Sequence, residues 1–365
     1  MRRGRTLKKR IIFLPAILCL SLLLTACGSG SFSLEGMKET AAANVSRKEG
    51  KSVVSDEYKD VIPDFVFTYA ENQPEDYPTV QGAEYFARRV NEETKGRIQI
   101  RIYANGILGE EPEVADRVSF GSIDFARVST AQLTKYSPMT RIIIMPYLYR
   151  DADHMWKVLE GTVGQQVMDS FDGTGLVPLS WYDAGVRDFY LKEPVNGLDD
   201  LKGKTIRVQK SDIMQDMIRA FGATPTTNPY DEVYSAIETG QVDGAENNWP
   251  SYVAMKHYQV AGYFLLDDHM RIPELQLVSE STMEQLPEED RDIIRKCAEE
   301  SAVYERKVWS GYEEEARKSA IEAGTEVISF SDAEKARFRA AVQPLYEKYC
   351  GDYMDLIEEI RKEGE

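Results

Sequence analysis

One arginine stands in an alternating run whose residue types could bind an anion. In the segment KTIRVQ, apolar Ile206 and Val208 face one side of an expected strand, and Arg207 faces the other side. A guanidinium group is permanently charged and carries five N–H donors, so it can hold a carboxylate through two parallel hydrogen bonds. The residues alone leave a second interpretation open, in which Arg207 is a surface arginine on an edge strand.

Polar side chains also follow a short apolar strand near the start of the chain. Glu71, Asn72 and Gln73 come directly after the segment DFVFTYA (64–70). In an open α/β sheet, the groups that bind a ligand gather in the loops at the carboxyl ends of strands. These three residues are therefore candidates for a ligand cleft, although a solvated turn would have the same composition.

Two further segments contain residues with possible chemistry. Trp249 could lay its indole face against the C–H side of a sugar ring, or it could plug an apolar core. Asp151, Asp153 and His154 lie within four residues, as the ligands of a metal often do. However, acidic residues at the start of an expected helix are favoured by capping and by the helix dipole. We therefore expect no metal site in this segment.

Strands and helices must position these residues. Apolar spacing predicts a helix over 77–95 that stops at Gly96, and alternating isoleucines predict a strand over 98–102. The segment IIIM (142–145), before a proline, is typical of a buried strand end. The pattern over 286–323 predicts one long helix, with a coiled-coil segment as the alternative.

Four sequence blocks occur together in the central part of the chain. They are DLKGKTIRVQ (200–209), GATP (222–225), EVYSAI (232–237) and GQVDGAEN (240–247). In this order and spacing they resemble the central signature of the solute receptors of tripartite ATP-independent periplasmic (TRAP) transporters. The resemblance extends from about Phe65 to the last long helix. It implies a two-lobed α/β fold of the periplasmic-binding-protein type, with an interlobe cleft, hinge crossings and a long helix that spans both lobes.

The resemblance also implies roles for residues of the second lobe. Arg207 would bind the carboxylate of the ligand, and Arg187, at the spacing that the family shows, would be a second arginine that helps to hold it. Tyr230 coincides with an aromatic position that lines the cleft, or is a wall residue without ligand contact. Asn247 coincides with the asparagine of the cleft. The adjacent Glu246 either reaches the ligand or braces Arg207 or the backbone.

Three features bear on which solute would bind. Ser129 falls where members that bind sialic acid have an acidic residue, so a serine there argues against an amino sugar. The segments NWPSY (248–252) and DHMRIP (268–273) are most similar to members that take sugar acids. We therefore predict a hexuronate or related sugar acid as the ligand, with a C4-dicarboxylate or a 2-oxo acid as the alternative.

The first segment has the features of an export signal. Six cations precede an apolar run over 11–24, which is too short for a comfortable membrane span. The segment LTAC (24–27) then resembles a bacterial lipoprotein processing site, which implies cleavage before Cys27 and a lipid on its sulfur. The alternative is an ordinary secretory signal in which Cys27 is incidental. The small and polar residues that follow predict a flexible tether to about residue 60.

Composition limits the partners of the chain. With 365 residues and 42% apolar content, it can bury two lobes. Loss of the six N-terminal cations takes the formal net charge from −17 to −23, so nucleic acid is a poor partner. Cys297 and Cys350 would remain, and we expect buried thiols because two cysteines do not make a disulfide framework.

These observations predict the following organisation: signal peptide 1–26, tether 27–60, lobe I 61–183 plus 272–310, lobe II 184–271 plus 311–345, and a helical tail 346–365. We expect an extracytoplasmic receptor, anchored by lipid at Cys27, that delivers a carboxylated small molecule to the membrane subunits of a TRAP permease. No cofactor is expected, and ATP should not bind because the chain lacks a Gly-x-x-x-x-Gly-Lys-Ser/Thr loop. The alternatives are a secreted enzyme for acidic sugars, for which no catalytic triad spacing is found, a surface adhesin, or the binding protein of an ATP-driven transporter.

Overall fold

The structure is a computed structural model that describes residues 50–363. The predicted signal peptide, Cys27 and most of the predicted tether lie outside the described residues. No helix in the described part of the chain has both the length and the apolar composition that a membrane crossing requires.

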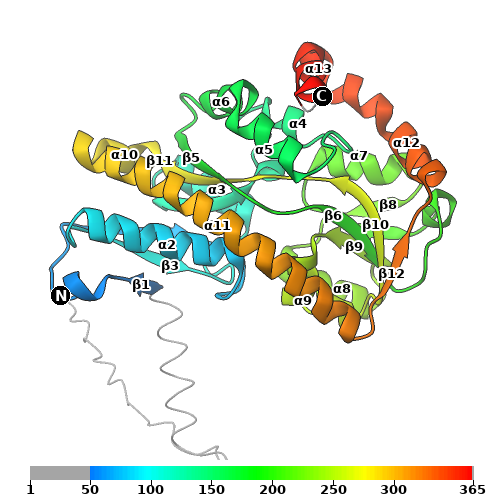
Figure 1. Ribbon diagram of the computed structural model, residues 1–365, viewed down its shortest axis with the longest axis horizontal. Coiled ribbons are helices and arrows are strands. Elements are labelled where there is room, and N and C mark those ends of the chain that lie inside the picture. The colour runs from blue at the N-terminus through cyan, green and yellow to red at the C-terminus, as the bar shows by residue number, and fades with distance from the viewer. Residues whose placement is uncertain (1–49, 364–365) are drawn as a thin grey trace, which may run out of the picture. The chain divides into compact units, whose positions relative to one another are not determined.

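The first of two six-stranded sheets is built mainly from the N-terminal half of the chain (Figure 1). Its strands are β1 (Lys51–Val53), β2 (Phe65–Ala70), β3 (Ile98–Tyr103), β4 (Phe125–Ser129), β5 (Leu176–Tyr182) and β11 (Glu274–Ser279). Their order in the sheet is β1-β3-β2-β4-β11-β5. Strand β2 runs parallel to β3 and β4, whereas β11 runs antiparallel to both of its neighbours. The sheet therefore receives β11 from a much later part of the chain.

The second sheet brings the ends of three strands to one edge. Its strands are β6 (Arg187–Leu191), β7 (Thr205–Arg207), β8 (Thr224–Thr226), β9 (Gly244–Asn247), β10 (Tyr263–Met270) and β12 (Glu326–Ser329), in the order β12-β10-β6-β9-β7-β8. Strands β7 and β9 are parallel, and β6 is antiparallel to β9. The last residues of β7 and β9 and the first residue of β6 therefore lie at the same edge of the sheet.

Helices cover the faces of both sheets. The α-helices are α2 (Pro78–Glu93), α3 (Glu111–Ser119), α4 (Thr140–Ile143), α5 (Ala152–Glu160), α6 (Thr162–Asp169), α7 (Asp212–Ala220), α8 (Val233–Glu238), α9 (Trp249–Ala254), α10 (Glu280–Glu284), α11 (Glu288–Glu322), α12 (Asp332–Cys350) and α13 (Met354–Lys362). Short 3₁₀ turns are η1 (Asp56–Tyr58), η2 (Thr130–Gln132), η3 (Leu198–Leu201), η4 (Tyr230–Glu232), η5 (His257–Gln259) and η6 (Gly351–Tyr353).

One long helix packs against both sheets. The chain crosses from the first sheet to the second at residues 183–186 and returns at 271–273. Helix α11, drawn in orange in Figure 1, then places Cys297 in the apolar cluster of the first sheet and Ala320 in that of the second. Gly324 follows the helix with φ +103°, a left-handed conformation that favours glycine. The predicted long helix and its stop are thus present.

The strongest periodic patterns are confirmed. Helix α2 buries its apolar face against the first sheet and α11, and Gly96 beyond its end has φ +82°. Strand β3 alternates buried and partly buried residues along its whole length. Cys297 and Cys350 are both buried free thiols, as predicted. Burial raises the pKa of Cys297 to about 12 and that of Cys350 to about 11.

Two predictions of local structure are wrong. The segment 142–145 ends the helical turn α4 instead of a strand, because a short buried apolar run has no period that separates the two. Lys51–Val53, within the predicted tether, forms β1 and pairs antiparallel with β3. This pairing uses backbone groups at the edge of the sheet, so the polar composition of the segment does not reveal it.

Candidate ligand-binding site

A cavity of about 250 Å³ lies where the edges of the two sheets face each other. Ligand pockets for drug-sized molecules hold roughly 300 to 1,000 Å³, so this one suits a smaller solute. Six of the residues singled out from the sequence line it: Asn72, Gln73, Arg187, Arg207, Tyr230 and Asn247. The strand topology explains this grouping, because Arg187 begins β6 while Arg207 and Asn247 end the adjacent β7 and β9.

Arg207 has most of its hydrogen-bonding capacity unused. Its side chain is 4% exposed, and its Nε donates to the carbonyl oxygen of Asn228 at 3.0 Å. Among residues 50–363, no carboxylate forms an ion pair with it. Burial lowers its pKa below the ordinary value for arginine. A buried guanidinium without an anion is costly, so this position favours an anionic ligand.

Arg187 is held in place by a buried carboxylate. Its Nε and Nη2 bond to the two carboxylate oxygens of Glu246 at 2.5 and 2.9 Å. Burial opposes ionisation of Glu246, but Arg187 and His269 outweigh it and keep the pKa of Glu246 below its ordinary value. His269 lies 3.4 Å from Glu246 and 3.0 Å from Asp267. The pair leaves Nη1 of Arg187 as its remaining donor toward the cavity.

Two amides and one hydroxyl complete the polar wall near the arginines. The side-chain oxygen of Asn247 accepts from the backbone N–H of Asn248 at 2.9 Å, and the oxygen of Asn72 accepts from Arg127. Both amides therefore have their NH₂ groups left to donate. The hydroxyl of Tyr230 is buried and has no hydrogen-bond partner within the described part of the chain. Burial raises the pKa of this residue to about 12.

The opposite wall contains a buried ion cluster that the sequence analysis missed. Arg127, in the middle of β4, is 1% exposed and contacts Glu71, Glu111, Glu274 and Asn72. Its Nε donates to Glu71 at 3.0 Å, and its Nη1 lies 3.1 Å from Glu274. The one signal in the sequence was a charged residue inside the apolar strand FARVS.

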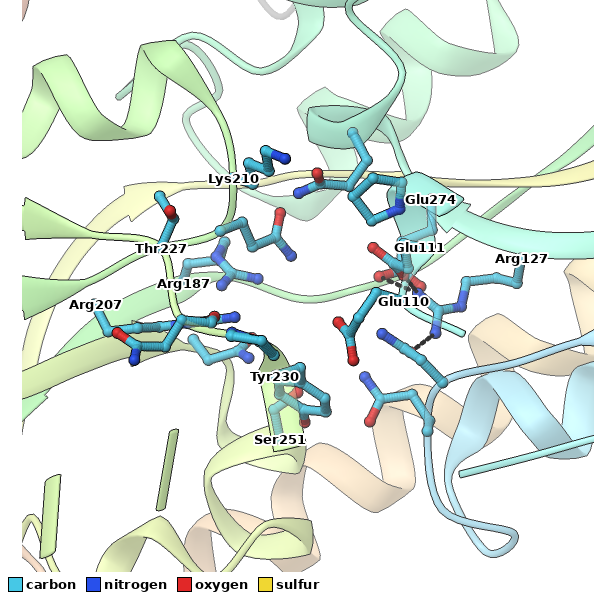
Figure 2. Close-up of a pocket in the computed structure, with 18 of the residues that line it drawn as sticks. Glu110, Glu111, Arg127, Arg187, Arg207, Lys210, Thr227, Tyr230, Ser251 and Glu274 are labelled. Carbon is cyan, nitrogen blue, oxygen red and sulfur yellow. Dashed lines mark hydrogen bonds and ion pairs between the residues drawn. The ribbon is translucent and has the colours of Figure 1, made fainter. Parts of the chain in front are cut away.

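Two carboxyl groups of this cluster, those of Glu274 and Glu111, are difficult to ionise. Burial is the largest influence on Glu274, and the neighbouring carboxylates add to it, so that its pKa rises to about 8 despite Arg127. Burial likewise raises the pKa of Glu111, with Arg127 opposing it. Figure 2 shows Arg187 and Arg207 on one side of the cavity, and Glu111, Glu274 and Arg127 on the other.

Four predicted site residues do not line the cavity. Glu71 turns inward to Arg127, and Glu246 braces Arg187 instead of Arg207. Ser129 donates to the side chain of Gln209 at 3.2 Å, which joins the two sheets.

The fourth residue, Trp249, lies in the core of the second sheet. Its ring stacks on Phe264 with centroids 3.5 Å apart, and it is 4% exposed. The preceding Asn248 caps α9 by accepting from the N–H of Ser251 at 2.7 Å, so the first residue of the helix turns into the core. The wall role expected for Trp249 is therefore wrong, and the open alternative of a core plug holds.

The segment with Asp151 and His154 has a structural role. Asp151 caps α5 by accepting from the backbone N–H of His154 at 2.8 Å, as the capping interpretation predicted. The ring of His154 bonds through Nε2 to the carbonyl oxygen of Ile360 at 2.7 Å. Within residues 50–363, no group of three or more histidine, cysteine or acidic residues could hold a metal ion.

Comparison with known proteins gives consistent matches over most of the chain. The family described as bacterial extracellular solute-binding protein, family 7, matches residues 69–352. A solute-binding protein of Chromohalobacter salexigens is 33% identical over 284 residues, which are 78% of this chain and 84% of that protein.

Solved structures agree with this match. A TRAP periplasmic solute-binding protein from Xanthobacter autotrophicus, solved with bound β-D-galacturonate, is 39% identical with a TM-score of 0.79, over 81% of this chain and 99% of the other. One from Pseudomonas putida, solved with bound D-glucuronate, is 34% identical with a TM-score of 0.79, over 81% and 97%. The predicted two-lobed α/β fold is confirmed. The chain belongs to the bacterial extracellular solute-binding proteins of family 7 and is a solute receptor of the TRAP type.

Proposed function

We propose that this protein is an extracytoplasmic receptor that binds a hexuronate in the cavity between its two sheets and delivers it to a TRAP permease. The observation that carries the proposal is the buried guanidinium of Arg207, which has no carboxylate partner among the described residues. The uronates bound in the two solved relatives support this class of ligand. A uronate combines one carboxylate with several hydroxyl groups, and the cavity offers partners for both.

The unused hydrogen-bond donors around the cavity indicate what each group would contribute to ligand binding. Arg207 has its two terminal nitrogens available, so it binds the ligand carboxylate through two parallel bonds. Arg187 adds Nη1, and Asn247 adds its NH₂ group. The hydroxyl of Tyr230 and the NH₂ group of Asn72 are placed for ring and hydroxyl oxygens.

The net negative charge of the chain does not oppose binding of an anion. Exposed charges more than about 8 Å away are largely screened at physiological salt, whereas a buried pair is screened much less. Two guanidinium groups inside the cavity therefore dominate the local interaction. Closure around the ligand excludes water, which strengthens each charge-assisted hydrogen bond. The crossings at 183–186 and 271–273 are the segments at which the lobes would move.

We also propose that the mature chain begins at Cys27 and is anchored there by lipid to the outer face of the membrane. This part of the proposal depends on the cationic and apolar segments and on LTAC (24–27). Metabolic labelling of the expressing cells with a fatty-acid analogue should label the wild type but not Cys27→Ser. Labelling of both proteins would contradict the anchor and leave the binding proposal standing.

A ligand panel tests the binding proposal. Isothermal titration calorimetry and thermal shift of the chain from residue 50 onward should be run against uronates, aldonates, C4-dicarboxylates and 2-oxo acids. We expect a hexuronate to bind with the highest affinity and to be recovered unchanged after prolonged incubation. Preferential binding of a C4-dicarboxylate, or conversion of the uronate to a product, would refute the proposal.

A further inference from the structure

The third arginine of the cavity differs from the other two in its hydrogen bonding. Arg127 has all of its donors occupied by protein: Nε and Nη2 bond to Glu71, Nη2 also bonds to Asn72, and Nη1 contacts both Glu111 and Glu274. A guanidinium group has five N–H donors, so none remains for a ligand. Arg127 therefore organises carboxyl groups and does not bind an anion, although it lies on the cavity wall.

The wall that Arg127 organises is acidic. One arginine is bonded to three carboxyl groups, of which Glu111 and Glu274 line the cavity together with nearby Glu110. These three cavity-lining residues are called the acid wall below. Carboxylate oxygens accept hydrogen bonds, so they pair with ligand hydroxyls but repel a ligand carboxylate.

The acid wall lies on one lobe, whereas Arg187 and Arg207, the two arginines with unused donors, lie on the other. Glu274 begins β11 of the first sheet, whereas Arg187 and Arg207 are on the second sheet. Figure 2 shows Glu111 and Glu274 facing Arg187 and Arg207 across the cavity, with Tyr230 and Glu110, the third member of the acid wall, between them. A ligand that closes the cleft must therefore present a carboxylate at one end and hydrogen-bond donors at the other.

Building on the proposed function, we infer that the acid wall reads the hydroxyl end of the solute and rejects a second carboxylate, so the receptor selects sugar monoacids over dicarboxylates of similar length. Hydroxyl groups donate to Glu274 and Glu111. A hexarate, which has the carbon chain of a hexuronate but a carboxylate at both ends, would place like charges together in a site from which water is excluded. Such juxtaposition is unfavourable where the wall is ionised, so at pH 9 we expect a hexarate to bind at least about 100-fold more weakly than the hexuronate.

Ionisation of the acid wall should make the selectivity depend on pH. Glu274 is faced by Arg127, Glu111 and Glu71 on its own lobe and by Arg187 from the other lobe, and its pKa is raised to about 8. Both carboxylates of a hexarate are already ionised above about pH 5. Raising the pH from 7 to 9 therefore adds negative charge to the wall and not to the ligand, so rejection of the hexarate should increase.

The test compares D-galacturonate with galactarate by isothermal titration calorimetry at pH 7 and pH 9. Selectivity is the dissociation constant of galactarate, the hexarate, divided by that of galacturonate, the hexuronate. We expect Glu274→Gln and Glu111→Gln each to lower this ratio about tenfold or more at pH 9. Glu274→Gln should also remove the increase between pH 7 and pH 9. Glu238→Gln is the matched control, because Glu238, at the end of α8, is exposed, does not line the cavity and has no ion pair among the described residues. It should leave the ratio unchanged.

The outcomes separate the two proposals. Wild-type protein that binds galacturonate and galactarate equally well at pH 9 would overturn the selective role of the acid wall, as would an unchanged ratio in both glutamine variants at that pH. Either result would leave the proposed hexuronate receptor intact. Failure of the wild type to bind any hexuronate would instead overturn the proposed function. Thermal melting of each variant confirms folding, and the two independent glutamine variants keep the test valid if one of them does not fold.

Discussion

Substitution of Arg207 by methionine should separate ligand binding from stability. The side chain makes one hydrogen bond, to the carbonyl oxygen of Asn228, and has no carboxylate partner in the described part of the chain. Methionine fills similar space without a charge. Losing that bond costs about 1 kcal/mol, and removing an unpaired buried charge offsets the loss. We therefore expect the free energy of unfolding without ligand to change by no more than about 1 kcal/mol.

The effect on affinity should be large. Loss of one partner of a buried, hydrogen-bonded charge pair costs about 2 to 5 kcal/mol, which weakens binding about 30- to 5,000-fold. For the wild type, ligand at about 100 times Kd adds about 2.7 kcal/mol of stability, or several degrees in Tm. Arg207→Met should lose this shift. Calorimetry gives the affinity, and thermal or urea unfolding gives the stability.

A surface arginine provides the matched control. Arg219 on α7 is exposed and pairs with Asp216 three residues earlier, so Arg219→Met should change neither affinity nor stability by a measurable amount. If Arg207→Met keeps wild-type affinity, the carboxylate is bound elsewhere. If it unfolds as readily as a variant that breaks a buried ion pair, the guanidinium has a structural partner, and the reasoning from its unused donors is refuted.

Three further predictions concern residues around the site. Arg187→Met leaves Glu246 buried without its main partner and should lower the free energy of unfolding by about 3 to 5 kcal/mol, measured by urea unfolding of the free protein. Trp249→Phe should destabilise the protein by about 1 to 3 kcal/mol while calorimetry finds the uronate Kd unchanged, and a large loss of affinity would contradict its place in the core. Although burial opposes its charge, Asp267 and Glu246 raise the pKa of His269 to about 9, so its stabilisation is complete below about pH 6.5 and is lost as pH rises through 9. Between about pH 6.5 and pH values above 9, His269 should therefore account for a fall on the order of 3 kcal/mol in the free energy of unfolding, measured by urea unfolding. A fall of similar size in His269→Asn would argue against the assignment of this pH dependence to His269.

The sequence was sufficient for the residues whose placement follows from strand ends. Asn72 and Gln73 follow a strand and line the cavity, and Arg207 ends a strand at the same edge as Asn247. The helical spacing of apolar residues and the glycine after each helix were likewise sufficient to predict α2 and α11. In these cases the informative residues lie close together in the sequence, so local pattern and position are coupled.

The acid wall could not be predicted from the sequence, because each of its members has a second, purely local reason to be at its position. Glu111 stands in the first turn of a helix, where the dipole favours any acid, and Glu274 begins a strand. Their meeting point, Arg127, follows Glu111 by 16 residues, and the pairing of β4 with the much later β11 brings Glu274 to it. The burial of Trp249 could not be predicted for a similar reason, because the cap that Asn248 forms on α9 determines which face of that helix is buried.

The position of β11 determines when the first lobe can be completed. Strand β5 joins its sheet only through β11, which is made after every strand of the second sheet except β12. A chain interrupted before residue 274 therefore leaves β5 without a neighbour and β4 with an open edge. Contacts of such long sequence separation form slowly and leave unpaired strands exposed in the meantime. Neither lobe should consequently be obtainable as a contiguous fragment, and premature termination should yield aggregating material instead of half a receptor.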